Sequence, residues 1–181
     1  LNQKVIRTGW PMEYMEPILE QYKGMEKHNI ILFPHRIAPE KQIDIFRDLA
    51  KELPFKCIVC QDTELTKDEY HELLGTAKIV FSANLQETLG ISCYEGTLVN
   101  TIPLVPDRLS YSEMYNEIYT YPSEWTRSFK HYIKHKKELI SVITDIMDNY
   151  PIYLESLIDQ TDDLLHFFHG ERLYNTISSS V

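Results

Sequence analysis

Several hallmarks of membrane, secreted and nucleic-acid-binding proteins are scarce or missing in this sequence of 181 residues. No apolar run approaches the length of a membrane span, and no signal peptide is visible. Only three cysteines are present, which favours a reducing, cytoplasmic compartment. The formal net charge of −9 argues against nucleic-acid binding through overall charge. The chain begins with Leu1 instead of Met, so we expect a piece of a longer protein.

A metal site is also not expected. Cys57 and Cys60 have the spacing of a zinc or redox pair, but they lie in a predicted strand over 55–60. Residues three apart on a strand point to opposite faces, so we interpret both as small core residues. No Asp-x-Asp motif follows a predicted strand, and the histidines show no ligand spacing.

Apolar strands alternate with amphipathic helices through most of the chain. This alternation predicts parallel βαβ units with right-handed crossovers, and therefore an α/β, Rossmann-like domain of three layers with additional C-terminal helices. The predicted strands are 29–33, 55–60, 78–82, 101–105 and 118–121. The predicted helices are 39–53, 67–74, 88–99, 110–115, 127–148 and 152–168.

The two ends of the chain are predicted to lie outside this domain. Residues 1–28 are interpreted as a linker or the remnant of an inter-domain segment, with a short strand at 4–7 and a loosely helical stretch over 12–25. Residues 29–150 form the predicted domain. Residues 151–181 are expected to hold a C-terminal helix and a loose tail from Ser178.

The stretch from Glu87 to Glu95 carries the strongest signal for a site. It follows the predicted strand 78–82 and enters a helix, whose first N–H groups point outward where the helix dipole is positive. Such a helix start suits a phosphate, and Gly90 lets the backbone approach a ligand closely. A carboxylate accepts two hydroxyls at once, so Glu87 and Glu95 each suit a sugar ring or a ribose.

Two cations follow another predicted strand end. Arg36 and Lys41 come directly after strand 29–33. Because ligands bind outside the carboxyl ends of parallel strands, we expect these cations to converge with Glu87 and Gly90 on one rim. The plainer interpretation is a surface pair at a helix start, with Glu87 attracted to a helix dipole and Glu95 solvated.

These motifs, in this order, resemble the C-terminal, donor-binding domain of GT-B fold glycosyltransferases of the family 4 kind. The resemblance rests on the Glu-x7-Glu pair with Gly90, on the loop from Pro34 to Lys41, and on the segment 96–105, and it covers roughly residues 29–150. It implies a retaining, metal-independent hexosyltransferase. Its donor substrate would be a nucleotide diphosphate sugar, and no cofactor is implied.

The resemblance also implies a role for each candidate residue. Glu87 would be catalytic and hold sugar hydroxyls near the reacting carbon, while Glu95 would hold the ribose. The cations would neutralise the diphosphate leaving group. The implied donor-binding residues are Arg36, Lys41, Thr88, Leu89, Gly90 and Glu95.

Two residues depart from the family pattern. His35 and Gln42 stand where the family usually has glycine, and both are expected to crowd the backbone near the phosphate. The family places its acceptor groups on an N-terminal domain that this sequence does not include. The chain alone is therefore expected to bind a nucleotide sugar and to turn over slowly or not at all.

Other interpretations stay open. One rival is a nucleotide-sugar epimerase or phosphorylase of the same architecture, and another is a degenerate GT-B-like domain kept for binding. The His35-Arg36 strand end and the Tyr/Pro-rich stretch after Val105 faintly resemble glycosyltransferases that modify nucleic-acid bases, which makes a nucleic-acid acceptor a further alternative. The basic stripe over 127–137 is interpreted as a solvated helix face.

Overall fold

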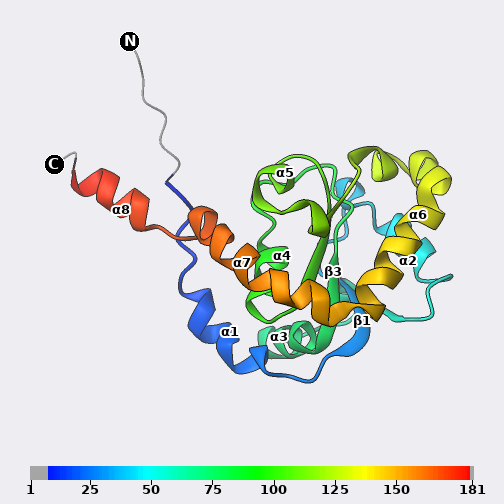
Figure 1. Cartoon of the computed structure of the whole chain (residues 1–181), viewed down its shortest axis with the longest axis horizontal. Coiled ribbons are helices and arrows are strands. Elements are labelled where there is room, and N and C mark those ends of the chain that lie inside the picture. Colours follow the sequence, from blue (N-terminus) through cyan, green and yellow to red (C-terminus); the bar gives the residue numbers. More distant parts are fainter. Residues whose placement is uncertain (1–7, 180–181) are drawn as a thin grey trace, which may run out of the picture.

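The computed structural model describes residues 8–179, which form a parallel five-stranded sheet with helices on both faces (Figure 1). The strand order is β2-β1-β3-β4-β5. The strands are β1 (His28–Phe33), β2 (Lys56–Val59), β3 (Ala77–Phe81), β4 (Ile102–Pro106) and β5 (Thr120–Tyr121). All five predicted strands are present with ends shifted by one or two residues, which confirms the α/β, Rossmann-like fold.

The helices are distributed over the two faces of the sheet (Figure 1). On one face α2 (Ile43–Leu49) packs against α6 (Phe129–Asp148), and on the other α3 (Lys67–Thr76) packs against α4 (Ile91–Leu98). This division is what right-handed crossovers between parallel strands require. The remaining elements are α1 (Met15–Lys23), η1 (Pro39–Lys41), η2 (Cys60–Asp62), α5 (Tyr111–Met114), η3 (Glu117–Tyr119), η4 (Ser123–Thr126), α7 (Tyr150–Phe168) and α8 (Glu171–Ser178).

Aromatic side chains build the core between the sheet and α2. Phe46 of α2 stacks on Phe33 of β1 and on Phe81 of β3, with ring centroids 5.3 and 5.8 Å apart. Phe81 also stacks on Tyr121 of β5 at 6.1 Å. All four side chains are fully buried, as expected for strands covered on both faces. The core therefore fixes the strand ends that carry the candidate site.

Three helix boundaries differ from the predictions. The helix predicted from residue 39 is interrupted at Gln42, whose φ of 54° and ψ of 44° are left-handed. The helix predicted from residue 88 begins only at Ile91, because Gly90 before it has a φ of 66°. The helix predicted over 67–74 continues to Thr76 and includes Gly75, where a Cβ atom would lie 2.8 Å from Tyr22 O. Gly75 thus serves close packing on α1.

The C-terminal region also differs in part. Pro151 lies in the first turn of α7, where its missing N–H is not needed, so it opens that helix directly after α6. The helix α8 was not predicted, and none of its residues is buried. Ser178, expected in a loose tail, ends α8. The predicted strand over 4–7 lies outside the described residues, and the division of the chain at 28 and 150 stays a prediction.

The basic stripe over 127–137 lies mainly at the surface. On α6, Lys130, Lys134 and Lys137 are exposed, while Lys136 turns toward α2 and contacts Asp48 at 2.7 Å.

Cys60 lies in η2 after the strand, so β2 is shorter than predicted. Burial raises the pKa of both Cys57 and Cys60 to about 11, which suits inert thiols. No helix within residues 8–179 is both long and apolar enough to span a membrane.

Candidate functional site

An open groove of about 720 Å³ lies at the carboxyl end of the sheet. It runs from the residues after β1 and β2, across the start of α3, to the first turn of α4. This is the edge at which ligands of parallel α/β sheets bind. The groove is lined by Pro34, Cys60, Gln61, Thr63, Glu64, Leu65, Thr66, Lys67, Tyr70, Ile91, Ser92 and Glu95.

Glu95 lies half-buried in this groove and is held by a tyrosine. Tyr70 donates a hydrogen bond from its hydroxyl to Glu95 Oε2 at 3.0 Å. Burial raises the pKa of Glu95, although the Tyr70 hydroxyl and the charge of Lys67 oppose this. The structure therefore differs from the solvated-helix interpretation, since Glu95 is oriented and desolvated. One carboxylate oxygen remains for a hydroxyl donor from a ligand.

Lys41 and Glu87 form an ion pair where the loop after β3 approaches η1. Lys41 Nζ lies 3.0 Å from Glu87 Oε2, and their side chains are only 11% and 17% exposed. Asn84 Nδ2 donates to the same carboxylate oxygen at 2.9 Å, and the Thr88 amide donates to Oε1 at 3.0 Å. Burial tends to raise the pKa of Glu87, but Lys41 and the amides of Thr88 and Gly90 outweigh it and lower that pKa. Glu87 is thus ionised at neutral pH.

The start of α4 depends on Gly90. Its left-handed φ of 66° favours glycine, and a Cβ atom there would lie 2.5 Å from Tyr111 Cε1. Beyond it, the amides of Ile91 and Ser92 begin the helix at the edge of the groove, and neither has an acceptor among residues 8–179. Leu89 is partly buried beside them. The helix start therefore offers two N–H groups to an anion.

Arg36 takes a different place from its predicted partner Lys41. Its side chain is 72% exposed and forms an ion pair with Glu40. Among the described residues, the cluster around Glu87 thus contains Lys41 and not Arg36. The surface-pair interpretation describes the observed geometry of Arg36, whereas Lys41 is buried in the cluster.

The two departures from the family pattern do not line the groove. His35 is buried, and its Nε2 lies 3.2 Å from Phe81 O, so the ring occupies the interior. Burial lowers the pKa of His35 to about 4, which leaves it neutral at pH 7. Gln42 keeps the left-handed backbone that glycine favours, and its Nε2 donates to Ala83 O at 2.5 Å and to Thr126 O at 2.6 Å.

Sequence reasoning missed four residues that support this site. They are Lys67, Tyr70, Asn84 and Arg108. Asn84 is the third residue after β3, so its place near a strand end was a signal that the sequence offered. Tyr70 and Arg108 gave no comparable signal, because their partners lie 25 and 24 residues away.

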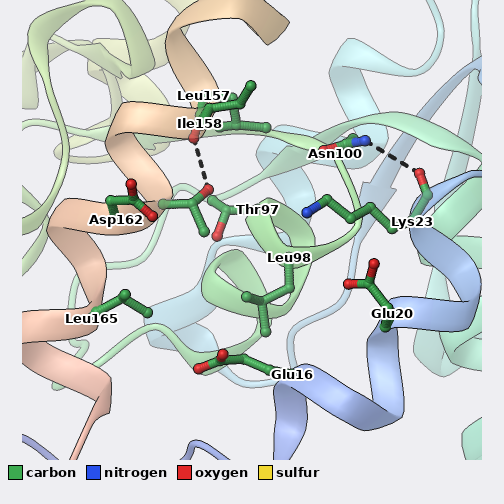
Figure 2. A pocket seen from close by; sticks show the side chains of 11 residues that line it. Glu16, Glu20, Lys23, Thr97, Leu98, Asn100, Leu157, Ile158, Asp162 and Leu165 are labelled. Atoms are coloured by element: carbon green, nitrogen blue, oxygen red, sulfur yellow. Dashed lines mark hydrogen bonds between the residues drawn. The ribbon is translucent and has the colours of Figure 1, made fainter.

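A second hollow, of about 200 Å³, lies between α1, the end of α4 and α7 (Figure 2). Asn100 there donates to Lys23 O at 3.2 Å, and the carboxylates of Glu16, Glu20 and Asp162 border the space. Three carboxylates with one lysine repel a diphosphate. The groove at the carboxyl end of the sheet is therefore the candidate site. Within residues 8–179, no three His, Cys, Asp or Glu side chains are grouped to hold a metal ion.

Comparison with known proteins shows a likeness in fold. The sequence matches no protein-family model and no curated protein. Among solved structures, the crystal structure of TarM is similar, with a TM-score of 0.63 and 14% sequence identity. The match covers 97% of this chain and 37% of the TarM chain, so this chain spans little more than a third of that protein's length. At this identity the likeness establishes a shared α/β fold.

Proposed function

We propose that the groove binds a nucleotide diphosphate sugar, and that the chain is the donor-binding half of a retaining glycosyltransferase of the GT-B type. The observation that carries the proposal is the placement of Glu95. An ionisable carboxylate is held by Tyr70 inside a groove that ends at the free amides of α4. A ribose would bind Glu95, and the diphosphate would extend toward Ile91 and Ser92.

Each end of the donor meets groups of suitable chemistry. In the transfer, the bond between the anomeric carbon and the diphosphate oxygen breaks and the sugar forms a bond to the acceptor oxygen. The proton of the acceptor hydroxyl passes to the departing diphosphate. Negative charge grows on the departing nucleotide diphosphate, and Lys41 with the amides of α4 would stabilise it. Glu87 would accept hydroxyls of the sugar, and Arg36 would reach the phosphates by rotating its exposed side chain away from Glu40.

The fold likeness supports this proposal. TarM is a glycosyltransferase of the GT-B type, and nearly the whole of this chain aligns with about a third of it. An acceptor would then bind to a further domain that lies outside the matched part. We expect the chain alone to bind the donor, with slow or no transfer.

A thermal-shift screen tests the proposal with the chain as it stands. The ligands are UDP, GDP, ADP and their common sugars. A ligand at a hundred times its Kd adds about 2.7 kcal/mol to the free energy of unfolding, which raises the melting temperature measurably. We expect the nucleotides of one base to raise the melting temperature of the protein. The variant Glu95→Gln should lose this rise. The matched control is Glu20→Gln in the second hollow, which should keep it.

The rivals predict other outcomes. A domain with only a binding role for other molecules would show no shift with any nucleotide, and a shift that survives in Glu95→Gln would sink the assignment of the groove. An epimerase or phosphorylase would bind the same donor. Product analysis of the donor incubated with the protein, with and without phosphate, separates those two from a transferase.

A further inference from the structure

Side chains of other segments hold the loop of residues 82–86, which leads from β3 to Glu87. We call it the site loop. Four of its five carbonyl groups accept hydrogen bonds from side chains of other segments. The bonds run from the Tyr121 hydroxyl to Ser82 O (2.7 Å), from Gln42 Nε2 and Arg108 Nη2 to Ala83 O (2.5 and 3.2 Å), from Arg108 Nε to Asn84 O (2.9 Å) and from Lys41 Nζ to Gln86 O (3.0 Å).

Arg108 contributes most to this arrangement. Besides the two bonds to the site loop, its Nη1 donates to Ser123 O at 3.1 Å, and its Nη2 donates to Thr126 Oγ1 at 2.5 Å. The guanidinium thus bridges the site loop to η4 on the far side. All of these acceptors are neutral oxygens, and none is a carboxylate. A charged group with five N–H donors thus binds only neutral backbone and hydroxyl oxygens at this place.

We propose that Arg108 is a positioning residue for the sugar and diphosphate end of the donor site. It fixes Ala83 and Asn84, and through them it sets where Glu87 and Lys41 stand. Three nitrogens of Arg108 share the bonds to the site loop and η4, and the single nitrogen of a lysine cannot reproduce them. The inference rests on the proposed function for the identity of the ligand, but the fixing of the loop is independent of any ligand.

The geometry predicts that the effect is confined to one end of the donor. Glu95 and its partner Tyr70 belong to α4 and α3, and neither is hydrogen-bonded to Arg108. Loosening the site loop should therefore disturb the groups for sugar and diphosphate while the ribose contact stays intact. A residue that served folding alone would weaken all ligands equally or none.

The first test compares two ligands by calorimetric titration of the variant Arg108→Lys. We expect the nucleotide diphosphate sugar to bind at least tenfold more weakly, with the affinity for the nucleoside monophosphate of the same base within twofold of the original. The control is Arg47→Lys, a surface residue that pairs with Asp62, which should change neither. Equal weakening of both ligands, or no change in either, would overturn the inference.

The second test needs no ligand and separates this inference from the proposed function. Hydrogen exchange of the Leu85 amide, which donates to Glu40 O at 2.7 Å, and of the Thr88 amide reports the order of the site loop. We expect both to exchange faster in Arg108→Lys, with the amides of α3 unchanged. If the original protein binds no nucleotide sugar, the proposed function fails. If the hydrogen exchange of these two amides is unchanged in Arg108→Lys, the positioning role is overturned, whatever the ligand.

Discussion

Lys41 and Glu87 are 46 residues apart in the chain, yet Lys41 Nζ lies 3.0 Å from Glu87 Oε2 in a largely buried ion pair. The ammonium group proposed for the diphosphate is thus neutralised by the carboxylate proposed for the sugar. Glu87 also accepts the Thr88 amide, so its carboxylate occupies the place of an anion beside the helix start. Donor binding would exchange this internal anion for a phosphate.

The variant Glu87→Gln should separate the two roles. Removing the internal anion frees the charge of Lys41, so we expect the nucleotide diphosphate to bind about threefold to tenfold more tightly, which corresponds to about 1 kcal/mol. The sugar would lose its carboxylate acceptor, so the affinity of the nucleotide sugar relative to the diphosphate should fall. Calorimetric titration measures both, and Glu20→Gln is the control. A weaker affinity for the diphosphate in Glu87→Gln would contradict this exchange.

The variant Tyr70→Phe tests the orientation of Glu95. Loss of the hydroxyl donor removes a group that stabilises the carboxylate, so the pKa of Glu95, already raised by burial, should rise further. Because the ionised form is the one proposed to accept the ribose hydroxyls, nucleotide affinity should fall as pH drops through that pKa. We expect the fall to begin at a higher pH in the variant. Carboxyl titration by NMR and affinity against pH provide the measurement.

A control for this change is Tyr153→Phe, whose hydroxyl bonds Asp145 away from the groove. It should leave the pH profile of nucleotide binding unchanged. An identical profile for the original protein and Tyr70→Phe would show that Glu95 needs no support from Tyr70.

Substitutions at Gln42 separate backbone strain from side-chain bonding. Gln42→Ala removes the bonds to Ala83 O and Thr126 O but keeps the left-handed backbone, so we expect a loss of about 2 to 3 kcal/mol in the free energy of unfolding. Gln42→Gly loses the same bonds but adopts a φ of 54° without strain. It should be about 1 kcal/mol more stable than Gln42→Ala. Urea denaturation of both variants checks the order, and a glycine variant less stable than the alanine one would contradict it.

Because the partly buried Lys27 has a lowered pKa, we expect the free energy of unfolding to depend on pH. Its Nζ donates to Val99 O at 2.7 Å and to Thr101 Oγ1 at 2.8 Å, and burial lowers its pKa to about 7. Between that value and the ordinary lysine pKa of about 10.4, the unfolded chain holds a proton that the folded protein has released. The free energy of unfolding therefore rises with pH in this window, by at most about 1.4 kcal/mol per pH unit.

Comparison with Lys27→Met isolates this contribution. From pH 7 to pH 9, the original protein should gain stability relative to that variant, as measured by urea denaturation at each pH. The exposed residue Lys130 supplies the control, since Lys130→Met should give a difference that does not change with pH. A constant difference for Lys27→Met would show that Lys27 keeps its proton in the folded protein.

Local patterns in the sequence determined the architecture of this protein. Apolar runs of five or six residues alternate with segments of helical periodicity, and these patterns depend only on neighbours along the chain. They predicted all five strands. They did not predict the left-handed turn at Gly90, since the predicted helix began at residue 88. The capping box of Thr66 and Glu69 at the start of α3 likewise depends only on residues that are neighbours along the chain.

Only the tertiary structure decided how the side chains of the site are partnered. The pairing of Lys41 with Glu87, of Tyr70 with Glu95 and of Arg108 with the site loop joins segments 24 to 46 residues apart. Such contacts depend on how strands and helices pack, which no local propensity specifies. The exposed position of Arg36 was undetermined for the same reason, because a long surface side chain takes its partner from whichever groups the fold brings near.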